Sequence, residues 1–156
     1  MVARIDHIDE IIAALEQADW QPARTDDHSF ILAANVEEGG FFISGVLYAD
    51  DGLFSTRGNI PVYVPPSAVQ RVLAFIHYAN ARLPVGNFEY DDEAEQVFFR
   101  NGLLFRELTP SPQLIHNVVH EVFLAVQDFW GGIAALIAED KKIEDVFNEN
   151  YYGRRS

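Results

Sequence analysis

The chain of 156 residues contains no cysteine. This absence excludes a disulfide framework, a thiolate nucleophile, and a zinc or iron–sulfur site with cysteine ligands. Cations are also scarce, because 11 Lys and Arg stand against 24 Asp and Glu and give a formal net charge of −13. A protein of this charge repels nucleic acid and anionic lipid, so neither is expected as a partner.

The motifs that recur in nucleotide-binding proteins and serine hydrolases are missing as well. There is no G-x-x-x-x-G-K-[ST] loop, no G-x-G-x-x-G fingerprint and no G-x-S-x-G elbow, and the only lysines are Lys141 and Lys142. A nucleoside triphosphate site and a serine hydrolase site are therefore not expected. We predict that the protein is not an enzyme, and we assign no catalytic residue, no cofactor and no metal site.

Long apolar segments are absent too. Charged residues interrupt the aliphatic residues at positions 1–20, so this stretch lacks the unbroken apolar run of a signal peptide. The longest uncharged apolar run near the end, at positions 129–138, has ten residues and is too short to span a bilayer. A cytoplasmic protein without a membrane partner is expected.

Apolar and aromatic side chains, in contrast, are plentiful, at 49% and 13% of the residues. They suffice for a packed core, and the length suits one domain. Apolar residues recur at helical spacing over residues 5–19. Three apolar runs separated by glycine-containing turns follow at residues 30–36, 41–49 and 53–64, a pattern that predicts an antiparallel three-stranded meander.

The second half of the chain returns to helical spacing and then to strands. A helix is predicted over residues 65–83, opened by two prolines, and strands are predicted at residues 88–91 and 97–108. The segment T-P-S-P at 109–112 is typical of a helix start, with Ser111 as the capping residue.

The predicted order of elements is α-βββ-α-ββ-α. Strands that follow one another through short turns indicate the α+β class, with an antiparallel sheet packed against helices. We expect a single domain at residues 1–140, closed by a long helix, and a polar C-terminal tail at 141–156 that frays. Two dipeptides leave alternatives open: Asn101-Gly102 is either a hairpin turn or a bulge within one strand, and Gly131-Gly132 weakens or kinks the last helix.

Two histidines have the spacing of metal ligands. His116 and His120 are four residues apart on the last predicted helix, so both rings can lie on one face, and Glu121 follows. A zinc-protease helix carries a glutamate inside such a pair, whereas no acidic residue lies between these two. We therefore favour two polar helix residues over a metal site. The acidic clusters elsewhere fall in predicted turns, where local backbone hydrogen bonds and solvation explain them.

The strands carry the most informative pattern. In residues 41–49 and 97–106 the face opposite the predicted core keeps aromatic, aliphatic and arginine side chains, whereas a solvated face would be polar. This mixture is enriched in protein interfaces. The residues predicted to bind a partner are Phe42, Tyr48, Phe98, Arg100, Leu104 and Arg106. The alternative is that helices cover both faces of the sheet, and the sequence favours neither.

Several segments resemble the YbjN-like family, small bacterial proteins described as sensory transduction regulators. The resemblance is carried by a first helix ending in Trp20, H-Y-A-N at 77–80, L-P-V-G-N-F-E-Y-D at 83–91, V-F-F-R at 97–100 and D-F-W at 128–130. It covers residues 5–138, and its motifs are mainly structural.

The resemblance implies a fold like that of the type III secretion chaperones, an α+β sandwich that often dimerises and binds segments of other proteins. It brings no catalytic residue. We expect a non-enzymatic protein-binding module, a regulator or chaperone-like protein that acts as a homodimer on a protein or peptide partner. The alternative left open is a small-molecule or metal-binding protein that uses His116, His120 and nearby carboxylates.

Overall fold

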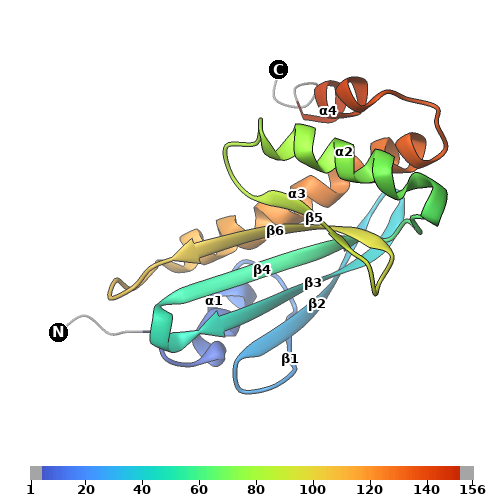
Figure 1. The fold of residues 1–156 in the computed structure, drawn as a ribbon. Coiled ribbons are helices and arrows are strands. Elements are labelled where there is room, and N and C mark those ends of the chain that lie inside the picture. The colour runs from blue at the N-terminus through green and yellow to red at the C-terminus, as the bar shows by residue number, and fades with distance from the viewer. Residues whose placement is uncertain (1–4, 152–156) are drawn as a thin grey trace.

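The computed structural model describes residues 5–151 and places six strands in one antiparallel sheet, with α1 and α3 on its far side in the view of Figure 1. The strand order across the sheet is β1-β2-β3-β4-β6-β5. The strands are β1 Ala23–Arg24, β2 Ser29–Val36, β3 Gly39–Tyr48, β4 Leu53–Ile60, β5 Asn87–Asp91 and β6 Gln96–Leu104. The helices are α1 Ile8–Gln17, α2 Val69–Asn80, α3 Pro112–Ile137 and α4 Ile143–Tyr151, with short 3-10 turns η1 Ala49–Asp51 and η2 Pro66–Ala68.

The predicted α+β class and antiparallel sheet are confirmed. Strands β2, β3 and β4 pair in sequence as the expected meander, and the ladder of β2 and β3 begins at the hairpin pair Val36 and Gly39. Strand β4 ends at Ile60 because Pro61 follows, and proline has no backbone N–H to donate to a neighbouring strand. The two elements that the sequence pattern did not predict are β1 and α4.

The core lies between the sheet and the helices, on one face of the sheet only. In β3, Phe41, Ile43 and Leu47 are buried, whereas Phe42 and Tyr48 are exposed. Helix α3 packs across β4 and β6, α1 packs against α3, and α2 lies along β5. Among residues 5–151 no helix covers the opposite face (Figure 1), so the alternative of two covered faces is wrong.

Asn101-Gly102 is neither a hairpin turn nor a bulge. Strand β6 runs through both residues, and its pairing with β4 keeps one register from Leu53 opposite Leu104 to Ile60 opposite Val97. The Asn101 side chain is buried on the core side, and its Nδ2 donates to the Val118 carbonyl of α3 at 3.1 Å. A buried amide with this partner ties the strand to the helix, which explains the asparagine.

Residues 143–151 correct the expectation of a fraying tail. They form α4, and Val146 and Phe147 are fully buried against the neighbouring helices α2 and α3. Ile143 and Tyr151 pack on the same core, so the apolar residues follow helical spacing. Acidic and amide residues between them make the segment polar on average, and the composition therefore predicted a tail. The core extends to α4, beyond the boundary predicted at residue 140.

Helix α3 is continuous through Gly131-Gly132, which therefore do not break it. Gly132 is buried where α4 crosses: a Cβ at this position would overlap Asn150 Nδ2 and lie 3.0 Å from Val146 Cγ1. Gly131 is exposed, and the nearest atom to a Cβ there would be Glu38 Oε1 at 3.9 Å. Only the second glycine is needed for the close approach of α4.

Side chains satisfy both ends of α3. Ser111 caps its N-terminus as predicted, because the Ser111 hydroxyl accepts the Leu114 N–H at 3.1 Å. At the other end the Arg71 guanidinium, which comes from α2, donates to the carbonyls of Leu136 at 2.8 Å and Ile137 at 2.9 Å. Although α3 has 26 residues, no helix within residues 5–151 is both long and apolar enough to cross a membrane.

The outer edge of β5 is occupied by a side chain. Asn80, the last residue of α2, donates from Nδ2 to the Phe88 carbonyl at 2.9 Å and accepts the Phe88 N–H on Oδ1 at 2.8 Å. One amide thus makes the pair of bonds that a neighbouring strand would make. This edge of the sheet is protected at its centre.

The two adjacent glycines of α3 are expected to respond in opposite ways to alanine. Gly131→Ala should raise the free energy of unfolding by about 0.5–1 kcal/mol, because alanine is the better helix former and the site has room. Gly132→Ala should lower it by about 1–3 kcal/mol, because the methyl group displaces α4. Urea unfolding followed by circular dichroism measures both. Stabilisation by both substitutions would contradict the packing of α4 on Gly132.

Candidate partner-binding face

The uncovered side of the sheet, which we call the open face, carries the side chains that alternate with the buried ones. Neighbouring strands hold these side chains in fixed register. Its residues include Ile31, Ala33, Phe42, Ser44, Val46, Tyr48, Leu53, Ser55, Arg57, Asn59, Glu89, Asp91, Phe98, Arg100 and Leu104, and the same register adds the polar residues Ser29, Asn87 and Gln96. The face therefore combines large apolar side chains with a charged group of residues.

One apolar row crosses three strands at one end of the open face. Tyr48 is opposite Leu53, and Leu53 is opposite Leu104. Tyr48 is 46% exposed and Leu104 is 56% exposed. Apolar side chains that are adjacent and exposed indicate a contact surface more strongly than single exposed ones do.

Two phenylalanines lie toward the other end of the same strands. Phe42 is 56% exposed, and its backbone N–H donates to Asn59 Oδ1 at 2.9 Å. Asn59 is in turn opposite Phe98 in the β4–β6 pair. Phe98 is half-buried, and the Arg57 guanidinium lies 4.0 Å from the centre of its ring. This contact places a cation over an aromatic face, which is an attractive arrangement.

A network of two arginines and two carboxylates lies between these apolar areas. Arg57 and Arg100 are opposite each other on β4 and β6. Glu89 of β5 accepts from Arg100 Nη2 at 2.9 Å and Nε at 3.1 Å, and from Arg57 Nη1 at 3.2 Å. Arg57 Nη2 also lies 3.5 Å from Asp91 Oδ2. The carboxylates hold two like charges side by side at the centre of the face.

The network changes the acidity of its central carboxyl. Partial burial by itself would raise the pKa of Glu89, but the hydrogen bonds and charges of Arg100 and Arg57 together outweigh it, so the pKa lies below its usual value. The pKa of Arg100 is raised, chiefly by its hydrogen bonds to Glu89. Glu89 and Arg100 therefore both stay charged at neutral pH.

Five of the six residues predicted to bind a partner come together on the open face: Phe42, Tyr48, Phe98, Arg100 and Leu104. Arg106 does not continue their alternation, because β6 ends before it. Its backbone has a φ of 53°, and its N–H donates to the Gly52 carbonyl at 2.9 Å. The binding role of all six residues stays a prediction.

Three charged residues of the open face were missed from the sequence. Arg57 lies in β4, where the apolar and polar residues alternate only weakly in the sequence. It alternates with the buried residues in step with Ser55 and Asn59, and this spacing could have placed it on the open face. Glu89 and Asp91 were assigned to a short strand and a turn. Both pair with Arg57, which is 32 positions before Glu89 in the sequence. No local sequence pattern shows a contact between residues so far apart.

The two histidines belong to an aromatic cluster beside α1. The Trp20 indole N–H donates to His116 Nδ1 at 2.9 Å. The rings of His116 and His120 stack with centroids 5.2 Å apart, and His120 stacks on Phe123 at 6.0 Å. The cluster fastens the segment after α1 to the first half of α3.

This geometry favours the structural role of the histidines. Because the indole can only donate, Nδ1 of His116 accepts, and a neutral ring then carries its proton on Nε2. Neither nitrogen of His116 is then left to ligate a metal without breaking the bond to Trp20. Within residues 5–151 no group of three or more His, Asp or Glu side chains could hold a metal ion.

The comparisons with known proteins agree with one another. The YbjN family model, described as "Putative bacterial sensory transduction regulator", matches residues 7–130. The fold is similar to that of a chain in the crystal structure of the ExsC–ExsE complex, with a TM-score of 0.55, 12% identity, and coverage of 80% of this chain and 91% of that one. It is also similar to YbjN from E. coli, with a TM-score of 0.53, 15% identity, and coverage of 85% and 89%. No curated protein matches the sequence.

The Glu89 network is expected to give the protein a defined acid sensitivity. The pKa of the Glu89 carboxyl is lower in the folded protein than in the unfolded chain. The contribution of Glu89 to stability is therefore present above about pH 5 and is lost as the pH falls through the lowered pKa. Glu89→Gln should cost about 1 kcal/mol at pH 7 and progressively less toward about pH 3. Urea unfolding over this pH range measures the difference.

The control for this experiment is Glu93→Gln, which removes the same charge from an exposed residue of the turn after β5. Its effect on stability should be small at every pH. A cost for Glu89→Gln that matches the control, or that does not change with pH, would contradict the network.

The Trp20–His116 hydrogen bond is expected to make stability depend on pH in a higher range than the Glu89 network does. Burial, and then the charge of His120, lower the pKa of His116. The unfolded chain therefore binds this proton more readily, and stability should fall as the pH drops below about 6.5. His116→Gln keeps an oxygen that can accept the indole hydrogen and should flatten this part of the profile. Melting temperatures between about pH 8 and pH 5.5 test it, and an unchanged slope would rule it out.

Proposed function

This chain belongs to the YbjN family, and on that premise we propose that it is a non-enzymatic, protein-binding regulator or chaperone-like module that acts as a homodimer in the cytoplasm. The open face is the surface that binds. The likeness to ExsC, a protein that occurs in a complex with ExsE, supports a protein as the partner. The proposal includes no nucleic acid and no membrane, in keeping with the net charge of −13.

The observation that carries the proposal is the mixture of side chains on the open face. Exposed Tyr48 and Leu104 lie on one side of the Arg57–Glu89–Arg100 network, and exposed Phe42 lies on the other. Aromatic and arginine side chains are enriched at the centres of protein interfaces, and isolated lysines are depleted there. A sheet face that only meets water would carry polar residues at these positions.

The charged network also suits binding better than catalysis. A general acid or base needs a pKa near the working pH, usually in a dry cleft. Arg100 and Arg57 instead keep the pKa of Glu89 below its usual value. Arginines that are already held in place lose less freedom when a partner binds, which favours affinity.

The proposal predicts that the apolar row of the open face is a binding hot spot. The double substitution Tyr48→Ser with Leu104→Ser should weaken self-association or partner binding by roughly tenfold or more, because each truncation removes an apolar anchor. The melting temperature should change little, because both side chains are largely exposed. Light scattering after size exclusion measures self-association. Calorimetric titration with a purified partner protein measures partner binding.

The matched control is Leu73→Ser, which removes an apolar side chain of α2 that is 41% exposed and lies off the open face. It should leave both kinds of binding unchanged. Loss of the dimer in the double variant alone would identify a second copy of the chain as an occupant of the face. A wild-type protein that neither self-associates nor binds a purified partner more tightly than the double variant does would overturn the proposal.

A further inference from the structure

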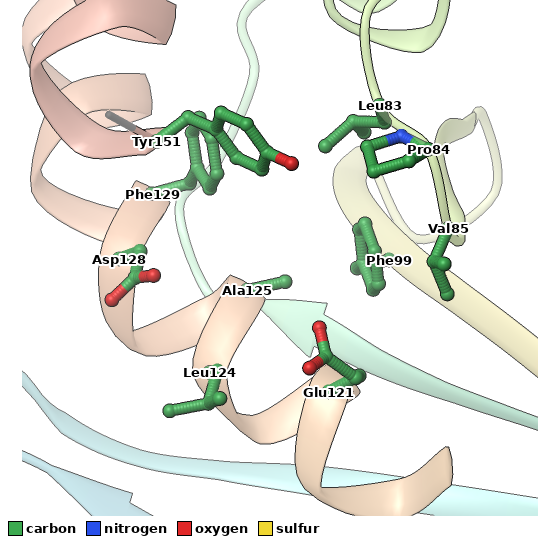
Figure 2. A pocket seen from close by; sticks show the side chains of 10 residues that line it. All are labelled: Leu83, Pro84, Val85, Phe99, Glu121, Leu124, Ala125, Asp128, Phe129 and Tyr151. Atoms are coloured by element: carbon green, nitrogen blue, oxygen red, sulfur yellow. The ribbon is translucent and has the colours of Figure 1, made fainter. Parts of the chain in front are cut away.

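Strand β6 is longer than its outer neighbour β5, so among the described residues part of its outer edge has no strand beside it. The pairing of the two strands ends at Arg100, whereas β6 continues to Leu104. The segment before β5 lies on the helical side instead, where Leu83 and Val85 line a cavity beside α3 (Figure 2). The outer edge of β6 is thus open at residues 101–104.

The turn into β5 depends on Gly86. Its φ is 72°, and a Cβ at this position would overlap the Phe99 ring and lie 3.0 Å from the Arg100 carbonyl oxygen. Glycine adopts this backbone conformation without steric cost, and it lets the segment cross close to β6. The same turn takes the chain away from the edge before it can pair with residues 101–104.

The alternation along β5 and β6 shows which backbone groups the open edge presents. Phe88 of β5 turns its N–H and C=O outward to Asn80, so the residues on either side of Phe88 bond to β6. The β6 partner of the residue before Phe88 is Arg100. Gly102 and Leu104 follow Arg100 at every second position, and they therefore turn their N–H and C=O groups the same way. No hydrogen bond to these groups is found among the described residues, so they can receive an added strand.

A hollow in the open face lies beside these groups. Gly102 lies at this hollow and has no side chain to fill it, and the other residues around it include Leu53 and Arg100. Apart from its chain neighbours, a Cβ on Gly102 would meet only the Phe54 carbonyl oxygen, at 3.3 Å. A large side chain of an adjacent strand can therefore lie over Gly102, a pairing that compensates for glycine at the edge of a sheet.

We propose that residues 101–104 bind an extended segment of a partner protein as an added strand, with an aromatic or large aliphatic side chain over Gly102. The segment forms backbone hydrogen bonds with Gly102 and Leu104, and this kind of recognition is strand addition. Side chains on one face of a strand are two residues apart, so a second apolar side chain contacts Leu104, which is 56% exposed. This mode of binding rests on the proposed function, and it requires a partner segment with apolar residues at alternate positions.

A flexible segment suits this edge better than a second copy of the chain does. The open stretch of β6 is short, because β5 begins beside Arg100. A folded copy would have to bring one of its own sheet edges into that stretch. The outer edge of its β5 is bonded to Asn80, its β1 has only two residues, and its β6 is open over the same short stretch. A segment that is not yet part of a sheet meets none of these limits.

Amide hydrogen exchange of the full chain tests the geometry of the edge. The N–H groups of Gly102 and Leu104 should exchange roughly a hundredfold faster than those of Asn101 and Leu103, which turn toward β4. NMR measures the exchange rates at several protein concentrations. Equal protection of both pairs would show that the edge is closed. Protection of Gly102 and Leu104 that rises with protein concentration would identify a second copy as the occupant. Either result overturns the proposal.

Binding is tested with short synthetic peptides, chosen by selecting a random peptide library on the full chain. Peptides that bind at this edge should carry apolar residues at alternate positions, and they should protect the Gly102 and Leu104 amides from exchange. N-methylation of the peptide backbone at alternate residues removes the N–H donors that face β6, and it should weaken binding by roughly tenfold or more. Calorimetric titration measures the affinities.

Two matched variants place the same side chain inside and outside the hollow. Gly102→Val puts a side chain where that of the peptide would lie, and it should weaken peptide binding by roughly tenfold. The melting temperature should change little, because valine suits a strand and the site has room. Ser44→Val adds the same side chain to the open face on β3, away from β6, and it should leave peptide binding unchanged. The N-methylated peptides test the wild type and do not depend on either variant.

The proposal is wrong if the selection yields no peptide that binds the purified chain, or if the selected peptides bind Gly102→Val as tightly as the wild type. It is also wrong if N-methylation leaves their affinity unchanged. Peptides that lose binding in Phe42→Ser but not in Gly102→Val bind elsewhere on the open face, which removes strand addition and supports the proposed function. Failure of the proposed function itself is seen in the self-association and partner titration described above, so the two failures are distinct.

Discussion

The close packing of α3 on the centre of the sheet is the contact on which the rest of this fold depends. A Cβ on Gly58 of β4 would lie 2.8 Å from Val122 Cγ1, so the helix can approach this far only because that residue is a glycine. In this position α3 receives the buried amide of Asn101 and the indole of Trp20, and its Gly132 provides the flat site for α4. The placement of one helix thus determines where the segment after α1 and helix α4 pack.

The same packing explains why the sheet has two unlike sides. All the described helices lie on the side of α3, so the opposite side of the central strands is left to its own side chains (Figure 1). There the charged ends of Arg57 and Arg100 meet the carboxylates of Glu89 and Asp91. The strands hold the side chains of the open face in place through their hydrogen bonds, and no layer of helices covers them. The open face is therefore ordered and still accessible.

The parts of the structure that the sequence could predict are those that depend on local spacing. The two faces of β3 and β6 follow from alternation, and the helix cap at Ser111 follows from a short motif. What escaped prediction depends on contacts distant in the sequence. A buried partner for Asn101 and a counterion for Arg57 are supplied by elements far along the chain. Helix α4 escaped because its few apolar residues matter only once α2 and α3 offer a groove to receive them.

The amide of Asn80 has a consequence for how copies of this protein can assemble. It occupies both backbone groups of Phe88 on the outer edge of β5, and the strand at the other edge, β1, has only two residues. Edge-to-edge growth of the sheet, the route to fibres, would have to break the Asn80 bonds at one end of each copy. Contact through the broad side of the sheet leaves them intact. Two copies that met through this side about a twofold axis would form a closed pair and not a polymer.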